Sequence, residues 1–300
     1  MAQLKKHIWL IETLRRHGKI SFKEISDMWE RNKDMSDYEP LHRGTFNRWR
    51  KDILITLGIE IKCQESGGYL YYIANPDDIN EDKLRHWILD TFSVGNLVQG
   101  NRSLKNRILV DEIPSGYLYL TPIMEAMRGN RVLEMGYTSF RTGETKTETV
   151  APYCVKLLEG RWYMLAKPKT KDNLKIYGLD RIRSLTILND MFKIPENFSA
   201  IEHFETMYGI VSDNQPPMRI ILRAYAQHKE YLKSLPIHHS QRLIEDHGDY
   251  ADFELWVAPT YDFIMRLLHD GAWLEVISPE SVRKTMKGWI YDMYEYYEDV

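Results

Sequence analysis

The sequence predicts an α+β protein built from several domains. Its 300 residues exceed what one hydrophobic core usually organises, so two or three domains are expected. Apolar residues follow a helical repeat over residues 1–57, whereas residues 130–187 follow the two-residue period of strands. From residue 218 onward the elements are expected in the order β-α-β-β-α-β, which is that of a ferredoxin-like fold.

Composition places the chain among ordinary globular proteins. Hydrophobic residues make up 43% and charged residues 28%, and no apolar run approaches the roughly 18 residues that cross a bilayer. The first residues lack the features of a signal peptide, so we expect a cytoplasmic protein and no membrane partner. Cys63 and Cys154 lack the spacing of a disulfide framework or a thiolate zinc site.

Charge is distributed unevenly along the chain. The formal net charge is -3, but residues 1–60 carry 12 Lys and Arg against 9 Asp and Glu. Residues 61–300 carry 28 against 34. A nucleic-acid contact is therefore expected in the N-terminal region.

The N-terminal region predicts three helices followed by a β-hairpin. Residues 4–17 have the helical repeat, and Ser21 with Glu24 forms a capping box at the start of a second helix. A third helix spans residues 42–57, and Gly58 ends it. Strands at 59–64 and 69–73 are joined by a glycine turn. This order is that of a winged helix-turn-helix.

The third helix has an apolar face and a basic face. Its apolar residues are Phe46, Trp49, Ile53 and Leu57, whereas Arg43, Asn47, Arg50 and Lys51 lie on another side. Such residue types reach phosphates and base edges in a major groove. The predicted DNA-binding residues of the helix and the hairpin are His42, Arg43, Thr45, Asn47, Arg48, Lys51, Lys62 and Ser66. A merely solvated basic face is the alternative.

The remaining chain predicts a linker and two β-rich domains. Helical patterns at 81–95 and 100–110 predict a helical linker, and a short helix at 122–128 precedes the next strands. Five strands predict a small, strongly bent barrel, at 131–137, 145–156, 161–167, 174–179 and 184–188. A helix at 196–207 leads into the last domain. The predicted domains are 1–75, 76–120, 121–195 and 196–300.

Motifs of enzymes and metal sites were sought without success. The sequence has no glycine-rich phosphate loop and no Gly-x-Ser-x-Gly elbow, so neither an enzyme nor a cofactor is predicted. His238 and His239 are neighbours on an extended segment and have no third ligand at metal spacing, so no metal site is predicted.

Three segments in order resemble the WYL-domain bacterial transcription regulators. The run Gly160-Arg161-Trp162-Tyr163-Met164 and the later run Tyr177-Gly178-Leu179-Asp180-Arg181-Ile182 resemble the motif pair of that family. Residues 271–283 resemble its C-terminal extension domain. Together with the N-terminal region, the resemblance covers nearly the whole chain. It implies an Sm-like WYL barrel that binds an effector, and a ferredoxin-like domain for dimer contacts or allosteric coupling.

The resemblance also implies ligand-binding positions. A nucleotide-like or nucleic-acid ligand is expected on a surface formed by Tyr137, Arg161, Tyr163, Tyr177 and Arg181. We expect Trp162 to lie mostly in the core and Tyr163 to be the better candidate for an exposed stacking surface, although alternation alone leaves the facing of the two open. Asp180, next to Arg181, is a possible pairing partner that would occupy that arginine.

One position departs from the resembling family. Gly178 stands where many members have a second arginine, which removes donors suited to phosphate. A weaker, different or lost ligand therefore remains open.

The function predicted from the sequence is a homodimeric transcription regulator that binds double-stranded DNA with an affinity set by the effector. The alternative is an accessory nucleic-acid sensor that docks on a partner enzyme. The operator, the sign of regulation and the dimer-forming domain are not determined by the sequence.

Overall fold

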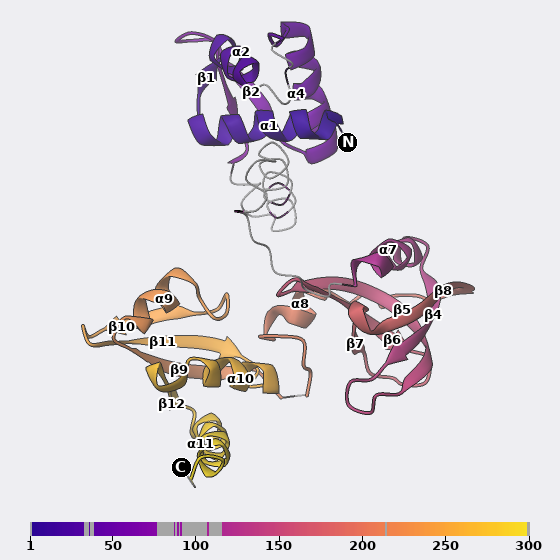
Figure 1. Cartoon of the computed structure of the whole chain (residues 1–300), viewed down its shortest axis with the longest axis vertical. Helices are drawn as coiled ribbons and strands as arrows, with labels where there is room; N and C mark the ends of the chain where they lie inside the picture. The colour runs from indigo at the N-terminus through magenta and orange to yellow at the C-terminus, as the bar shows by residue number, and fades with distance from the viewer. Residues whose placement is uncertain are drawn as a thin grey trace. The chain divides into compact units, whose positions relative to one another are not determined.

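The computed structural model describes residues 2–32, 36, 39–76, 87, 89, 91, 107, 116–213 and 215–298 (Figure 1). The chain separates into two compact units, Met1–Asp111 and Glu112–Val300. The predicted linker helices at 81–95 and 100–110 lie almost entirely outside the described residues. Within the part that is described, no helix has the length and apolarity needed to span a membrane.

The N-terminal unit contains helices around a small antiparallel sheet (Figure 1). Its elements are α1 (Ala2–His17), β1 (Ile20–Ser21), α2 (Phe22–Arg31), α4 (Arg43–Leu57), β2 (Ile61–Gln64) and β3 (Leu70–Ile73). The sheet has the order β1-β3-β2. The strand β1 was not predicted, because two residues carry no periodicity and its pairing partner, β3, lies far along the chain.

Local chemistry sets the helix ends of this unit as predicted. The Ser21 hydroxyl accepts a hydrogen bond from the Glu24 amide, and the Glu24 carboxylate accepts one from the Ser21 amide, so the capping box is confirmed. Gly58 ends α4 with a φ of 64°, in the left-handed region that glycine adopts without steric cost.

Aromatic packing holds α4 inside the N-terminal unit. Phe46 and Trp49 are almost fully buried. The ring of Trp49 meets that of Trp29 on α2 edge to face at 5.1 Å, and the ring of Phe46 meets that of Tyr71 on β3 at 4.7 Å. Leu89 joins the same core from the segment that follows the hairpin. One face of α4 is thereby fixed against α2 and the sheet.

The second unit begins with a helix packed on a five-stranded sheet. Its elements are η2 (Tyr117–Tyr119), α7 (Leu120–Arg128), β4 (Arg131–Thr138), β5 (Thr145–Leu158), β6 (Arg161–Pro168), β7 (Lys175–Gly178), η3 (Leu179–Arg181) and β8 (Ile182–Met191). The antiparallel order is β7-β6-β5-β4-β8. All five strands were predicted, and β5 and β8 are longer than expected. Ile123 and Ala126 of α7 are fully buried in the core of this sheet.

The C-terminal part of the second unit is a four-stranded antiparallel sheet with three helices (Figure 1). After α8 (Ala200–Glu205) its elements are β9 (Met218–Tyr225), α9 (His228–Ser234), β10 (Arg242–Asp246), β11 (Tyr250–Val257), α10 (Tyr261–His269), η4 (Gly271–Trp273), β12 (Leu274–Ser278) and α11 (Glu280–Glu295). The strand order is β10-β11-β9-β12. The element order β-α-β-β-α-β was predicted.

The helix expected at 196–207 is much shorter in the structure. The amide of Phe198 donates to the carbonyl of Pro195, which makes a turn before the helix. The hydroxyl of Ser199 then caps α8 by accepting from the Glu202 amide. A helical pattern in the sequence does not reveal such a turn, so the predicted start was wrong by several residues.

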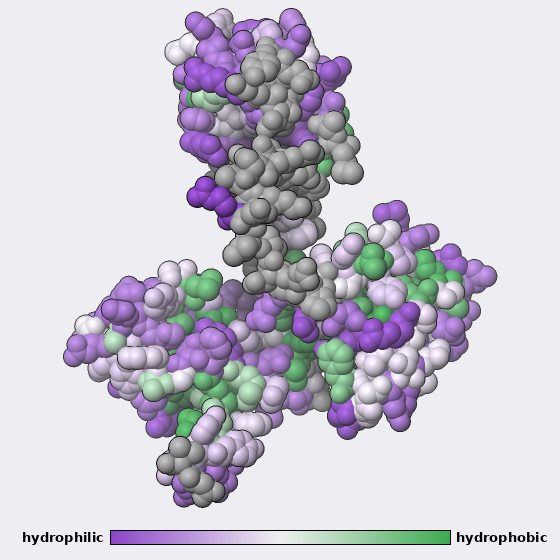
Figure 2. Space-filling view, viewed as in Figure 1, coloured by the Kyte–Doolittle hydropathy of each residue, from purple (hydrophilic) through white to green (hydrophobic). Residues whose placement is uncertain are grey.

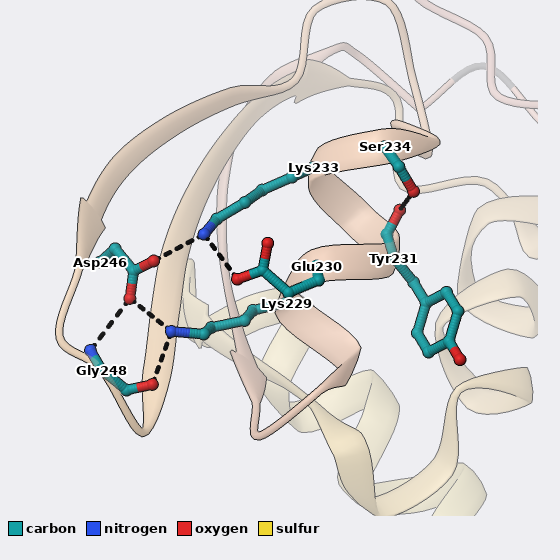
Figure 3. A network of polar contacts seen from close by, with 7 residues as sticks. All are labelled: Lys229, Glu230, Tyr231, Lys233, Ser234, Asp246 and Gly248. Carbon is teal, nitrogen blue, oxygen red and sulfur yellow. Dashed lines mark hydrogen bonds and ion pairs between the residues drawn. The ribbon is translucent and has the colours of Figure 1, made fainter.

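An ion-pair network joins α9 to the β10–β11 hairpin (Figure 3). The ammonium groups of Lys229 and Lys233 each lie 2.6 Å from a different carboxylate oxygen of Asp246. The amide of Gly248 also donates to Asp246, at 2.9 Å. The hydrogen bonds from Lys229, Lys233 and this amide hold the pKa of the Asp246 carboxyl well below its ordinary value.

We predict that Asp246 makes the stability of the second unit sensitive to acid. Because the pKa of its carboxyl is lowered in the folded state, its contribution is fully present above the ordinary value of 3.8 and is lost as the pH falls below it. Asp246→Asn should lower the melting temperature at pH 7, and the difference from wild type should shrink between pH 4 and pH 2. Asp249→Asn, in the same turn, is the control. A difference that is constant with pH would contradict the assignment.

Candidate functional site

The outward face of α4 presents most of the predicted DNA-binding residues to solvent. The exposed residues are His42, Arg43, Asn47, Arg48, Lys51, Lys62 and Ser66, and Thr45 is half-buried. The surface of this unit seen in Figure 2 is mostly hydrophilic. Most of these side chains are therefore accessible to solvent, which a groove contact requires.

Two arginines of the basic face make contacts inside the unit: the guanidinium of Arg43 lies 4.9 Å from the ring centroid of Phe22, and Arg50 makes several contacts. Its guanidinium donates to the carbonyl of Ile61 from Nη2 at 2.6 Å and from Nε at 3.1 Å. It also lies over the ring of Tyr71, 5.0 Å from the centroid. Arg50 therefore fastens α4 to β2 and β3.

The β2–β3 hairpin adds a polar tip beside α4. Gly67 and Gly68 have φ values of 92° and 114°, which the tight turn requires. Lys62 forms an exposed ion pair with Glu60 at 3.1 Å, so its charge is partly neutralised. Tyr69, which the sequence reasoning did not select, is 61% exposed just after the turn.

The five predicted ligand-binding residues come together around the end of β7. Tyr163 on β6 pairs with Gly178 on β7, and Tyr137 on β4 pairs with Ile182 on β8. The chain between Gly178 and Ile182 is the single turn η3, which contains Asp180 and Arg181. The sheet register thus brings strands β4, β6, β7 and β8 together around the turn η3.

The three tyrosine rings of this cluster are buried. Tyr177 is fully buried, and Tyr137 and Tyr163 are each 8% exposed. The expectation that Tyr163 offers an exposed stacking surface was therefore wrong. Trp162 is half-buried and packs against the core of the sheet. Sequence alternation places the two side chains on opposite faces but does not reveal that both faces are covered.

Hydrogen bonds fix the buried phenols. The Tyr177 hydroxyl donates to Glu148 Oε2 at 3.1 Å, and the Tyr137 hydroxyl accepts from the Gly178 amide at 3.2 Å. Burial raises the pKa of all three phenols, and in Tyr177 the neighbouring Glu148 carboxylate raises that pKa further. The Tyr137 hydroxyl thus holds the residue that precedes the turn η3, and the Tyr177 hydroxyl is fixed by Glu148.

Asp180 turns its carboxylate toward Arg161. The distance from Asp180 Oδ2 to Arg161 Nη1 is 3.8 Å, and the Asp180 side chain is only 7% exposed. No carboxylate in the described part of the chain lies within ion-pair distance of Arg181. The pairing of Asp180 with Arg181 that the sequence allowed is therefore not formed.

Arg181 stacks on an exposed aromatic ring. Its guanidinium carbon lies 4.2 Å from the ring centroid of Phe140, whose side chain is 64% exposed. Arg183 is also exposed, and its Nε donates to Thr138 Oγ1 at 3.0 Å. We call Phe140, Arg181 and Arg183 the arginine–phenylalanine patch. It joins an exposed aromatic face to two cations, which suits a ligand with a planar group and a negative charge.

Two polar side-chain atoms beside this patch find no hydrogen-bond partner among the residues that the structure describes. They are Asp180 Oδ1 and Arg181 Nε, and both are buried. A buried donor or acceptor without a partner costs about 1–3 kcal/mol.

Gly178 leaves room for the Asp180 carboxylate. A Cβ at this position would lie 2.6 Å from Asp180 Oδ1, 3.3 Å from Arg181 Nε and 3.6 Å from Tyr163 Cε1. The backbone φ of −71° suits any residue, so space and not conformation excludes a side chain here. In this chain the volume that an arginine would enter is occupied by Asp180.

Sequence reasoning missed several residues of the cluster. Phe140 and Arg183 were overlooked because neither belongs to a motif, and Phe140 lies in a turn. Lys175 was also missed: its Nζ lies 3.3 Å from Glu148 Oε1 and 4.6 Å from the centroid of Tyr177. The sequence could have indicated Lys175, because it is a basic residue two positions before Tyr177 on the same predicted strand.

The described residues contain no group of three or more His, Cys, Asp or Glu side chains that could hold a metal ion. His238 and His239 lie side by side, with ring centroids 4.0 Å apart. His238 Nδ1 is 2.7 Å from Ser240 Oγ, so that ring nitrogen already has a partner.

Comparisons with known proteins identify one domain of the chain. Residues 119–187 match the WYL domain family, so the five-stranded sheet with α7 forms a WYL domain. No curated protein matches the chain.

Two solved structures are similar to the chain at low identity. Proteasome accessory factor B/C (PafBC) of Arthrobacter aurescens is 16% identical, with a TM-score of 0.36, over 95% of this chain and 46% of that one. The chain thus spans about half the length of that protein. A CRISPR Cas-related protein is 10% identical, with a TM-score of 0.40, over 99% of this chain and 85% of that one.

We predict that Gly178→Ala destabilises the second unit. The added methyl group must displace the buried Asp180 carboxylate, at a cost of about 1–2 kcal/mol in free energy of unfolding. Gly288→Ala is the matched control, since nothing lies within 4 Å of a Cβ there and Gly288 is inside α11. That change should stabilise by up to about 1 kcal/mol. Chemical denaturation measures both, and equal effects would contradict the packing argument.

Proposed function

We propose that the protein is a DNA-binding transcription regulator whose affinity for DNA is changed by an anionic, nucleotide-like or nucleic-acid ligand on the WYL domain. The observation that carries the proposal is the exposed basic face of α4 next to a polar hairpin. The presence of a WYL domain supports the sensing half of the proposal.

Three fold assignments belong to this proposal. The order α1-β1-α2-α4-β2-β3 supports a winged helix-turn-helix, with α4 as the recognition helix. The bent five-stranded sheet supports an Sm-like barrel. The sheet order β10-β11-β9-β12 with helices after β9 and β11 supports a ferredoxin-like domain. We propose that the regulator is a homodimer, so that two recognition helices read two half-sites.

The arginine–phenylalanine patch is the proposed ligand surface. Arg181 lacks an ion-pair partner among the described residues, and its guanidinium already stacks on Phe140. A planar group could stack beside Phe140 while Arg181 and Arg183 contact a phosphate. In this proposal the turn η3 packs on three buried tyrosines, Tyr137, Tyr163 and Tyr177, which do not contact the ligand. Arg161 pairs with Asp180 and so keeps that carboxylate from pairing with Arg181.

A second candidate function is an accessory nucleic-acid sensor that docks on a partner enzyme. Its support is the C-terminal half of α11, where Val282 and Met286 are the last buried residues. The residues beyond them expose large side chains, namely Trp289, Ile290, Tyr291, Met293, Tyr294, Tyr296 and Tyr297. Such a surface suits a protein contact.

We predict that a triple variant, Arg43→Ala, Arg48→Ala and Lys51→Ala, loses affinity for duplex DNA from the region upstream of its gene. If these cations contact phosphates, the slope of log affinity against log salt should fall by about 2–3. Fluorescence anisotropy over a range of salt concentrations measures both quantities. The control, Arg242→Ala, Lys284→Ala and Lys287→Ala, removes the same charge from exposed positions of the second unit.

Equal binding by the triple variant and wild type would exclude α4 as the recognition helix. Absence of duplex binding by the wild type, together with a stoichiometric complex with an enzyme, would favour the accessory sensor.

We predict that Arg181→Gln weakens binding of labelled single-stranded oligothymidine to the full chain by about tenfold, because a charge-assisted contact is lost. Phe140→Ala should weaken it by a similar factor through loss of stacking, worth about 1–3 kcal/mol per base. Arg242→Gln removes an exposed cation elsewhere and should have no effect. Unchanged affinity in both patch variants would contradict the proposed ligand surface and leave η3 with a structural role only.

A further inference from the structure

A second concave surface lies on the WYL domain, away from the arginine–phenylalanine patch. It is a cavity of about 490 Å³ formed by the start of β4, the middle of β5, the ends of β6 and β8 and the turn after β6. None of the five predicted ligand-binding residues lines it. Arg161 is at the start of β6 and Arg181 precedes β8, so the two surfaces lie at opposite ends of these strands.

Cations outnumber anions around this cavity. Lys167, Lys169 and Lys171 line it together with Asp172 and Asp190. Lys167 Nζ lies 3.8 Å from Asp172 Oδ1, and Lys169 Nζ lies 3.7 Å from Asp190 Oδ2. For Lys171, no carboxylate of the described residues is within ion-pair distance.

The two ion pairs are weak enough to be replaced by a bound anion. The side chain of Asp172 is fully exposed, and those of Lys169 and Asp190 are 72% and 63% exposed. Exposed pairs at such distances contribute at most about 1 kcal/mol. An anion that contacts two lysines would therefore lose little by displacing these carboxylates.

The backbone holds the lysines in place. The Lys169 amide donates to the carbonyl of Thr149 at 2.8 Å, and Pro168 pairs with Val150 on the neighbouring strand. The Lys171 amide donates to the carbonyl of Pro168 at 3.3 Å. The turn that carries Lys169 and Lys171 is thus anchored to the sheet, which lowers the entropic cost of binding.

The rest of the cavity wall is apolar and partly aromatic. Val132 is half-buried at this wall, Val150 and Pro168 lie buried behind it, and Met191 is 74% exposed. Phe192 is held by a stacked contact with Tyr153, with centroids 5.9 Å apart and an interplanar angle of 7°. A volume of about 490 Å³ is within the range of small-molecule sites and exceeds the need of a free phosphate ion.

We infer that this cavity binds a small phosphate monoester with a planar or apolar organic part. Lys169 and Lys171 contact the phosphate as point charges, and the organic part lies against Met191 and Phe192. This site is separate from the proposed effector surface at Arg181. It gives the WYL domain a second place where a small anion binds.

The test is calorimetric titration of the full chain with AMP and with phenyl phosphate, and with adenosine and inorganic phosphate as partial ligands. We expect saturable binding of at least one ester, weakened by salt and stronger than binding of either partial ligand. The double variant Lys169→Gln, Lys171→Gln should lose about tenfold or more in affinity. Met191→Ala should weaken the binding of the ester but not the binding of inorganic phosphate.

Two controls separate this site from others. Lys193→Gln removes an exposed cation that follows β8 without lining the cavity, and Arg181→Gln alters the proposed effector surface. Both variants should retain the ester binding that the double lysine variant loses.

No saturable binding of either ester, or equal affinity in the double lysine variant and wild type, would overturn the inference. Loss of binding in Arg181→Gln alone would also overturn it, by placing the ester at the other surface. The titration contains no duplex DNA, so its failure leaves the proposed regulator untouched.

Discussion

The approach of Asp180 to Arg161 is the interaction on which the WYL domain's candidate site depends. A carboxylate next to an arginine in sequence would ordinarily neutralise it, but here Asp180 Oδ2 lies 3.8 Å from Arg161 Nη1 across the turn η3. Arg181 is left to stack on Phe140 at 4.2 Å. Because the Asp180 carboxylate lies toward Arg161, no carboxylate of the described residues is within ion-pair distance of Arg181.

Gly178 and the buried tyrosines make this choice possible. The absence of a side chain at Gly178 provides the volume that the Asp180 carboxylate fills. The hydroxyl of Tyr137 holds the Gly178 amide, and the ring of Tyr177 lies against that of Tyr137 at 5.0 Å. The glycine at position 178 is thus linked to the position of the Asp180 carboxylate. The recognition surface proposed here is the edge formed by Phe140, Arg181 and Arg183, while the tyrosines act as its support.

In the N-terminal unit, too, neighbouring arginines differ in their contacts. Arg50 is drawn inward by the Ile61 carbonyl and the ring of Tyr71, whereas Arg43 and Arg48 remain exposed. Residues with the same charge on one helix therefore differ in how far the fold engages them, since the guanidinium of Arg43 also lies over the ring of Phe22, at 4.9 Å from its centroid. Their spacing on the helix does not reveal this difference, because the difference depends on which acceptors and rings the fold brings near.

The sequence by itself determined the elements that arise from local interactions. The Ser21–Glu24 capping box, the glycine end of α4 and the strand periodicity of the WYL domain depend on residues a few positions apart. The motif residues lie around the turn η3, which the sequence did not predict as a turn. Tertiary structure alone decided that Tyr163 is buried, that Phe140 meets Arg181, and that β1 pairs with β3. The physical reason is that alternation shows which side chains share a face, whereas burial and pairing depend on segments that are distant in the chain.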